Sequence, residues 1–141
     1  EVFFKLTFAN TGIKTLQEDV TVLDELKIES NGNLDLGDQT IFLEGDWNNL
    51  ASEAAITENG TVQFQGSEIQ NIFCSGGEVF DNLAIDNSSE LDEGILINDN
   101  IRVDGDLTLN SGIIHPATIE EIVLGLNATN SGGDYRSYIL S

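Results

Sequence analysis

Short apolar pairs, each with one residue between its two members, run through most of the chain, and this period of two most constrains the fold. Successive side chains of a β-strand point to opposite faces, so both members of a pair lie on one buried face. The pairs recur about every six to eight residues in the best-patterned stretches, and Gly, Asn, Asp or Ser fills most of the gaps. The clearest pairs are Leu6 with Phe8, Val20 with Val22, Leu26 with Ile28, Ile41 with Leu43, Val62 with Phe64, Leu83 with Ile85, Ile95 with Ile97, Ile101 with Val103, and Leu107 with Leu109. Each pair predicts a very short strand with one buried face.

Strands this short, joined by short turns, favour a solenoid in which the chain winds and its strands stack in parallel from coil to coil. Three faces of roughly seven residues make a coil of about 20 residues, so we expect about six to seven coils at ~4.8 Å each, a rod on the order of 30 Å long. Residues 47–56 contain several alanines, and we expect a loop or short turn there; no other stretch indicates a helix. The prediction is an all-β parallel solenoid, with a β-sandwich as the alternative.

A longer repeat lies over this pattern. The stretch VFFKLTFAN (2–10) matches VFDNLAIDN (79–87) at an offset of 77, and later apolar pairs match at an offset of 81. An insertion near residues 92–96 explains the change of offset. The matched positions include Leu6 with Leu83, Asn10 with Asn87, Val22 with Val103, and Leu26 with Leu107. We therefore expect one solenoid domain, 1–141, holding nearly two copies of a unit of about 80 residues, at about 1–78 and 79–141.

The charge and the cysteine content exclude several classes of protein. The formal net charge is −20, from 25 acidic and 5 basic residues, which argues against binding nucleic acid or anionic lipid. No apolar run approaches the length of about 18 residues that would span a membrane. The single cysteine, Cys74, allows no internal disulfide, and its apolar neighbours predict a buried, inert thiol.

Five phrases occur in order along nearly the whole chain: GDWNN (45–49), GTVQFQGSEIQNI (60–72), VFDNLAIDN (79–87), VDGDLTLNSGII (103–114) and GGDYRSYI (132–139). Together they resemble the repeats of large secreted, adhesin-like surface proteins of Bacteroidota, often exported by the type IX secretion system. The resemblance implies a right-handed parallel β-helix and an extracellular, cell-surface location. It implies neither a ligand nor a catalytic residue. In such proteins the last phrase runs on into further chain, so we expect a piece of a longer stalk, or a subunit whose ends are covered by neighbours.

Several residues have expected structural roles. Gly105 allows a corner, Leu107 and Leu109 fill the core, and residues 110–112, ending at Gly112, turn the chain. Asn10 and Asn87 occupy matched turn positions, where an Asn side chain can bond the backbone or stack on an Asn of the next coil. Trp47 follows Gly-Asp in one of the family phrases, and we expect it to be structural rather than a platform for sugars.

The polar residues indicate little chemistry. Asp104 and Asp106 flank Gly105, and both are expected to face outward on a solvated surface. They are also the best candidates for Ca²⁺ ligands, although the sequence contains no known calcium-binding motif. His115 is the only histidine and stands before a proline, so we expect a surface turn residue and no transition-metal site. No cofactor is expected.

Three functions follow, in order of preference. The first is a non-catalytic structural repeat module of a bacterial adhesin, stalk or filament, with neighbouring coils or head-to-tail copies as partners. The alternative is a module that binds a glycan or a cell surface, where Tyr135 and Tyr138 could stack on sugars. The third, a polysaccharide-active enzyme, needs convergent acids and basic residues to hold an acidic sugar, and the sequence supports neither.

Overall fold

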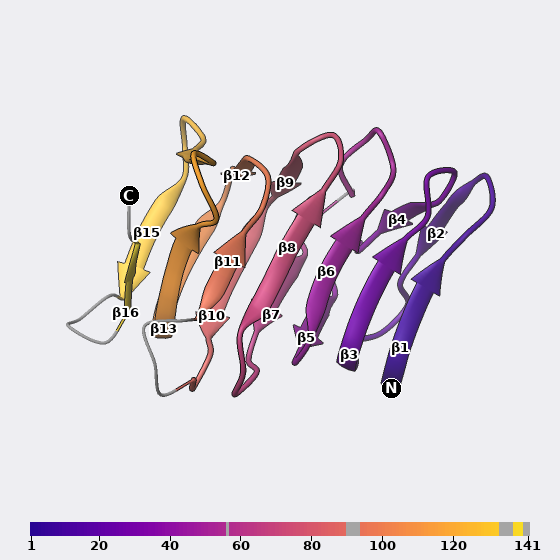
Figure 1. Cartoon of the computed structure of the whole chain (residues 1–141). Helices are drawn as coiled ribbons and strands as arrows, with labels where there is room; N and C mark the ends of the chain where they lie inside the picture. The colour runs from indigo at the N-terminus through magenta and orange to yellow at the C-terminus, as the bar shows by residue number, and fades with distance from the viewer. Residues whose placement is uncertain (56, 90–93, 133–136, 140–141) are drawn as a thin grey trace.

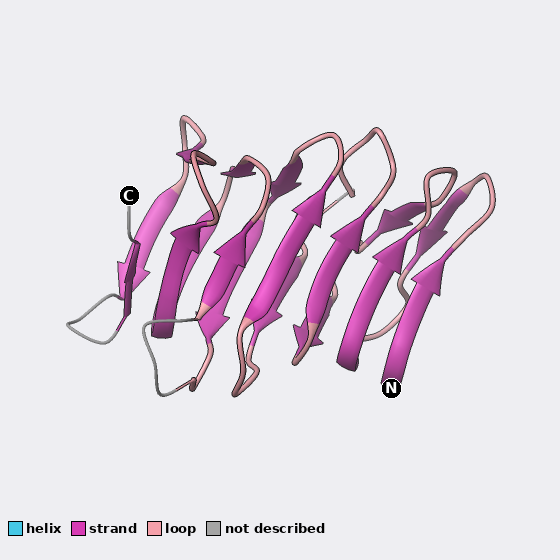
Figure 2. Ribbon diagram, viewed as in Figure 1, coloured by secondary structure: helices cyan, strands magenta, loops and turns pink. Residues whose placement is uncertain are grey.

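The structure is a computed structural model that describes residues 1–55, 57–89, 94–132 and 137–139. Across these ranges the chain forms strands and loops and no helix (Figure 2). The strands are β1 (Val2–Phe8), β2 (Ile13–Thr15), β3 (Val20–Ile28), β4 (Asn33–Asp35), β5 (Thr40–Leu43), β6 (Asp46–Asn49), β7 (Thr61–Phe64), β8 (Gln70–Cys74), β9 (Glu78–Phe80), β10 (Asn82–Asp86), β11 (Ile95–Ile97), β12 (Ile101–Val103), β13 (Asp106–Pro116), β14 (Ile122–Leu124), β15 (Thr129–Gly132) and β16 (Ser137–Ile139).

The strands stack in parallel on three faces, and each coil lies beside the next along the axis (Figure 1). On the first face β5, β7 and β10 lie between the first halves of the long strands β3 and β13, and β15 follows. On the second face β6, β8 and β11 lie between the second halves of β3 and β13, and β16 follows. The third face holds the pair β2 and β4 and the sheet of β9, β12 and β14.

The register gives the length of each coil directly. Val2 pairs with Thr21, 19 residues later, whereas Asn71 pairs with Leu96, 25 residues later. These values bracket the expected coil of about 20 residues. The prediction of a right-handed parallel β-helix is confirmed, with about six coils, and the β-sandwich alternative is wrong.

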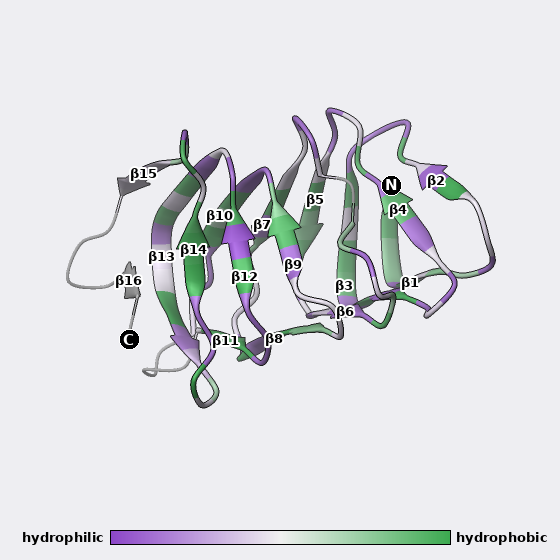
Figure 3. Ribbon diagram, turned by 90° about the horizontal axis from the view of Figure 1, so that it is seen from above, coloured by the Kyte–Doolittle hydropathy of each residue, from purple (hydrophilic) through white to green (hydrophobic). Residues whose placement is uncertain are grey.

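The core is the column of inward side chains that runs through all the coils. The members of the predicted pairs are buried, except Leu6 in β1, which is half-buried. Figure 3 shows apolar and polar residues alternating along the strands. Leu107 is fully buried and Leu109 is 4% exposed, so both fill the core as predicted. In a parallel ladder each apolar side chain stacks on one from the coil before, at a spacing of about 4.8 Å.

The corner after the first face differs from the prediction. Residues 110–112 do not form a turn between strands, because β13 continues through them. The register shows why: Ile85 pairs with Leu109 and Asp86 with Ser111, so Asn110 is an extra residue that bends the strand. Gly112 has a φ of 90°, and a Cβ there would lie 2.8 Å from the Asn87 carbonyl oxygen. The chain therefore turns this corner within one long strand.

The other predicted corner, at Gly105, lies between β12 and β13. A Cβ on Gly105 would lie 2.8 Å from the Asp81 carbonyl oxygen, so the close approach of two coils requires glycine there.

The two matched halves of the sequence do not occupy matched faces. Leu6 pairs with Leu26 on the second face, whereas Leu83 pairs with Val62 and Leu107 on the first. The asparagines differ in the same way: Asn10 is exposed with a φ of 67°, and Asn87 is 1% exposed. Residues that match between the two halves of the sequence therefore lie on neighbouring faces of the solenoid and not on the same face. Asn10 and Asn87 do not stack on each other.

Candidate functional site

The most unusual side chain of the core is a carboxylate. Glu78 begins β9, points inward and is 2% exposed. Its partner in the next coil is Ile101, and Ile122 follows, so an acid occupies a column of the third face that is otherwise apolar. Burial of a carboxylate is costly unless hydrogen bonds satisfy its oxygens.

Four donors from two coils surround the Glu78 carboxylate. Its Oε2 accepts from Trp47 Nε1 at 2.8 Å and from Asn49 Nδ2 at 2.9 Å. Its Oε1 accepts from the backbone N–H of Ala55 at 2.8 Å and, more weakly, from that of Val79 at 3.3 Å. Trp47 and Asn49 are adjacent inward positions of β6, and Ala55 belongs to the loop that follows β6.

Among the described residues, no basic side chain contributes to the environment of the Glu78 carboxylate. Burial raises the pKa of Glu78 to about 7, although the hydrogen bonds from Asn49, Trp47, Ala55 and Val79 act in the opposite direction. Burial also raises the pKa of the nearby Cys74 thiol, and the charges of Glu78 and Asp99 raise it further.

Cys74 lies at the end of β8 and is 1% exposed, which confirms the predicted burial. Its Sγ lies 3.9 Å from the Asn100 carbonyl oxygen. A thiol held in its protonated form is a poor nucleophile, so this pair of buried groups, Glu78 and Cys74, lacks the activated thiolate that covalent catalysis needs.

Trp47 is fully buried, and its ring meets Phe80 edge to face with 5.4 Å between the ring centroids. Its indole therefore cannot stack on a sugar. The structural role expected for Trp47 agrees with this placement, with the added function of donating to Glu78.

A second buried polar group lies at the corner after the first face. Asn87 Nδ2 donates to the Glu68 carbonyl at 2.8 Å and to Gln70 Oε1 at 3.0 Å, and Asn87 Oδ1 accepts from the Ser89 N–H at 2.9 Å. Gln70 Nε2 in turn donates to the carbonyls of Leu43 and Gly45. The network ties successive coils together where the strands stop.

The calcium candidates are not brought together as a ligand set. Asp104 accepts two hydrogen bonds from the Arg102 guanidinium, at 2.6 and 2.8 Å, and Asp106 accepts from the Thr129 hydroxyl. Within the described ranges no group of three or more His, Cys, Asp or Glu residues is placed to hold a metal ion. Nothing in the geometry of Asp104 and Asp106 supports a Ca²⁺ site.

A cleft of about 390 Å³ lies outside the third face, beside the loop that Glu78 holds. Its lining is Ala55, Thr57, Glu58, Val79, Asp81 and Asp104. Two of its acids already have partners: Asp104 binds Arg102, and Asp81 Oδ2 accepts from the Asn59 N–H at 2.8 Å. The cleft is a polar hollow on the surface, and its Asp81 and Asp104 side chains bind groups of the protein itself.

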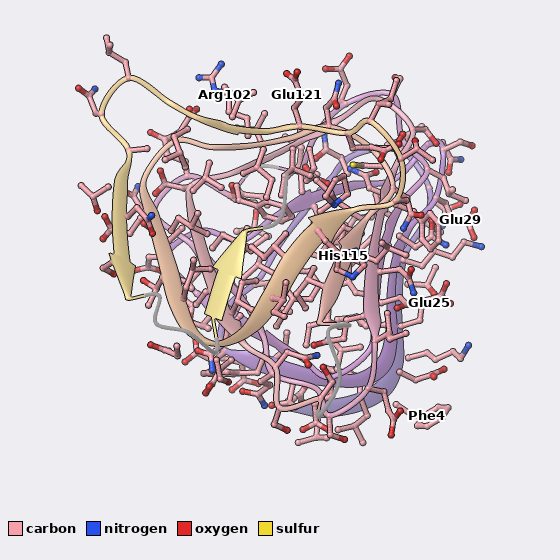
Figure 4. The ribbon with its side chains drawn as sticks, turned by 60° about the vertical axis from the view of Figure 1, so that its left-hand side comes forward. Phe4, Glu25, Glu29, Arg102, His115 and Glu121 are labelled. Carbon is pink, nitrogen blue, oxygen red and sulfur yellow. The ribbon has the colours of Figure 1, made fainter. Side chains whose placement is uncertain are left out.

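The remaining predicted residues lie as follows. His115 is in β13 and not in a turn, so that prediction is wrong; its alternation within the strand places it opposite Leu96, on the outside of the second face (Figure 4). Tyr138 lies in β16, of which only the backbone is described. Tyr135 and part of the 92–96 insertion lie outside the described residues.

In comparisons with known proteins, no protein-family model, curated protein or solved structure matches the chain. In the described part of the chain no helix is long and apolar enough to cross a membrane.

Sequence reasoning missed Glu78. The signal was present in Glu78-Val79-Phe80, which has the same alternation as Ile101-Arg102-Val103, but only the register shows that Glu78 and Phe80 are the inward members.

Proposed function

We propose that this chain is a non-catalytic structural repeat module of a bacterial cell-surface adhesin, stalk or filament. The observation that carries the proposal is the continuous inward column on the first face, where apolar pairs stack from Val20 and Val22 in β3 to Leu107 and Leu109 in β13. In such a column each coil packs on the next, and this suits a rod-like spacer that holds another part of the protein away from the cell.

The chemistry of the polar groups supports the same proposal. The best-organised acid, Glu78, is buried and saturated by donors from the protein itself, and Asp104 and Asp106 are engaged by Arg102 and Thr129. Polysaccharide cleavage by two carboxylates needs an accessible pair about 5 to 10 Å apart. The acids that the protein itself engages in this way give the enzyme hypothesis no support, and we propose a non-catalytic role.

An extracellular location and an adhesin as the parent protein are parts of the proposal that are supported by the five sequence phrases. The partners we propose are neighbouring coils of a longer chain or head-to-tail copies. β1 pairs on one edge only, with β3, within the described residues, and Phe3, Leu6 and Leu16 beside it are half-buried around a cleft of about 200 Å³. An unpaired edge over apolar side chains favours the addition of a further coil.

The test is a binding experiment on the folded chain, extended by one coil of its parent at each end if such sequence exists. A glycan array and intact cells are probed with and without Ca²⁺, and a polysaccharide panel is assayed for new reducing ends. A spacer predicts no saturable binding and no cleavage. Saturable binding would favour the alternative, a glycan- or surface-binding module, and new reducing ends would overturn the non-catalytic assignment.

A further inference from the structure

The two ends of the solenoid differ in the side chains that they present. β1 and β2 lie at one end, and β14 and β15 lie at the other (Figure 1). Three residues of β1 pair with buried apolar residues of β3 and therefore occupy inward positions: Phe3, Leu6 and Phe8. At the other end the inward positions of β15 are Asn130 and Gly132, and both are exposed. The β1 end is thus suited to an apolar partner, which β15 of a second copy would not supply.

β1 is also an open edge. Within the described residues it pairs only with β3, so the backbone groups along its other side have no strand partner. Beside this edge Phe3, Leu6 and Leu16 are half-buried and line a cleft of about 200 Å³. Phe4, which is 67% exposed, projects from the corner between the first and second faces (Figure 4). An open strand edge beside apolar side chains is a site at which another chain can pair.

The distribution of charge favours contact between two copies at this end. Residues 1–18 contain two acidic and two basic side chains, so their formal charge is zero. The whole net charge of −20 therefore lies on the rest of the chain. Two copies repel each other over most of their surfaces, and they approach with the least repulsion where both are neutral. The β1 end is the part of the molecule that is at once apolar, unpaired and neutral.

The order of inward and outward residues along β1 is complementary to itself. The inward residues Phe3 and Leu6 are three positions apart, because the register with β3 shifts at Phe4. When β1 is laid antiparallel on a copy of itself, with a two-fold axis just after Phe4, Phe3 faces Leu6 of the copy and Val2 faces Thr7. Inward residues then meet inward residues, and outward residues meet outward ones. A strand with an uninterrupted period of two would not match itself about such an axis.

We propose that the β1 end is an interface between two copies of this chain, which pair their β1 strands antiparallel and head to head. The pairing gives each open edge a partner and covers Phe3 and Leu6 with apolar groups of the other copy. It rests on the structural role proposed above and names the partner at this end, while the other end is left to neighbouring coils. The two proposals fail separately. Saturable glycan binding or cleavage would overturn the structural role, whereas a monomer that binds nothing would overturn only the pairing.

Sedimentation equilibrium of the folded chain tests the pairing. The end of one solenoid is a small contact, so we expect a dimer that forms at micromolar concentration or above and dissociates on dilution. Association should tighten as NaCl is raised, because salt screens the repulsion between two acidic bodies. A chain that stays monomeric up to about 1 mM, or that grows beyond the dimer, would overturn the proposal.

Phe4→Lys tests the contact itself. In the proposed register Phe4 faces Lys5 of the other copy, so a lysine there places like charges together at two symmetric points and should raise the dimer Kd by about 10-fold. The variant also lowers the net negative charge, and general repulsion alone would therefore predict the opposite change. Leu126→Lys is the matched control, because it makes the same change of charge at a fully exposed apolar residue outside β1. An unchanged Kd in Phe4→Lys, or an equal rise in Leu126→Lys, would contradict the interface.

Disulfide cross-linking tests the register without a change of charge. Val2 of one copy faces Thr7 of the other, and both side chains are exposed in the single chain. A mixture of the Val2→Cys and Thr7→Cys proteins should form a mixed disulfide dimer under mild oxidation, in higher yield than either variant forms alone. Cys74 is buried and does not compete. A mixed dimer no more abundant than the two symmetric dimers would refute the head-to-head register.

Discussion

Asn10 and Asn87 offer a direct comparison between sequence similarity and structural register. They occupy the same position in two matched phrases, yet Asn10 is exposed and Asn87 is buried with three hydrogen bonds from its side chain. We expect Asn87→Ala to lower the free energy of unfolding far more than Asn10→Ala does. If the two positions were structurally equivalent, the two substitutions would have similar effects.

The magnitudes follow from the contacts. A net hydrogen bond contributes about 1 kcal/mol, so the loss of the three bonds of Asn87 costs about 3 kcal/mol. Asn10 has a φ of 67°, which Asn tolerates better than Ala, so Asn10→Ala costs about 1 kcal/mol through the backbone alone. Asn10→Gly should recover that loss because glycine accepts the same φ freely, whereas Asn87→Gly should be at least as damaging as Asn87→Ala.

Urea denaturation followed by far-ultraviolet circular dichroism measures all four variants, with the wild type as reference. The separation of about 2 kcal/mol between the two alanine variants exceeds the usual error of such measurements. Equal losses at the two positions, or rescue by glycine at both, would refute the register and the reasoning built on it.

Three further expectations follow from the core and the polar surface. Leu43→Ala should lower the free energy of unfolding by about 2 to 5 kcal/mol in urea denaturation, because Leu43 is fully buried, whereas Leu126→Ala, at a fully exposed position, should change it by less than about 0.5 kcal/mol. Cys74 should resist a thiol reagent at pH 8 in the native protein and react fully in denaturant; rapid native labelling, scored by mass spectrometry, would argue against its burial. Chelation of Ca²⁺ should leave the melting temperature unchanged, since Asp104 and Asp106 are held by protein groups, and a fall on chelation that both Asp→Asn variants abolish would reveal a calcium site.

The fold could be predicted because one local rule governs nearly every coil. Pairs such as Leu107 with Leu109 show their inward face through alternation alone, and the frequent turn residues limit the strand length. The face on which a pair lies could not be predicted in the same way. A displacement of about seven residues moves the chain from one face to the next without disturbing the period of two, so Leu6 and Leu83 match in sequence and differ in place.

Glu78 shows a different limit. Its four donors include Trp47, Asn49 and Ala55, which lie 31, 29 and 23 residues earlier in the chain. No local pattern connects them, because they converge only when one coil stacks on the next. A buried acid is also the least expected occupant of an apolar column, so its position becomes visible only with the register.

Distance measurement between spin labels tests the central claim, the parallel stacking of coils in the observed register, most directly. Thr21, Phe42, Gln63, Ala84, Thr108 and Ser131 follow one another across six successive strands of the first face. At about 4.8 Å per coil the Cα atoms of Thr21 and Thr108 should lie about 19 Å apart, and those of Thr21 and Ser131 about 24 Å. Double electron–electron resonance on the two labelled pairs should therefore give narrow distributions that differ by one strand spacing, about 5 Å. Broad distributions, or two distances that do not differ by one spacing, would contradict the solenoid.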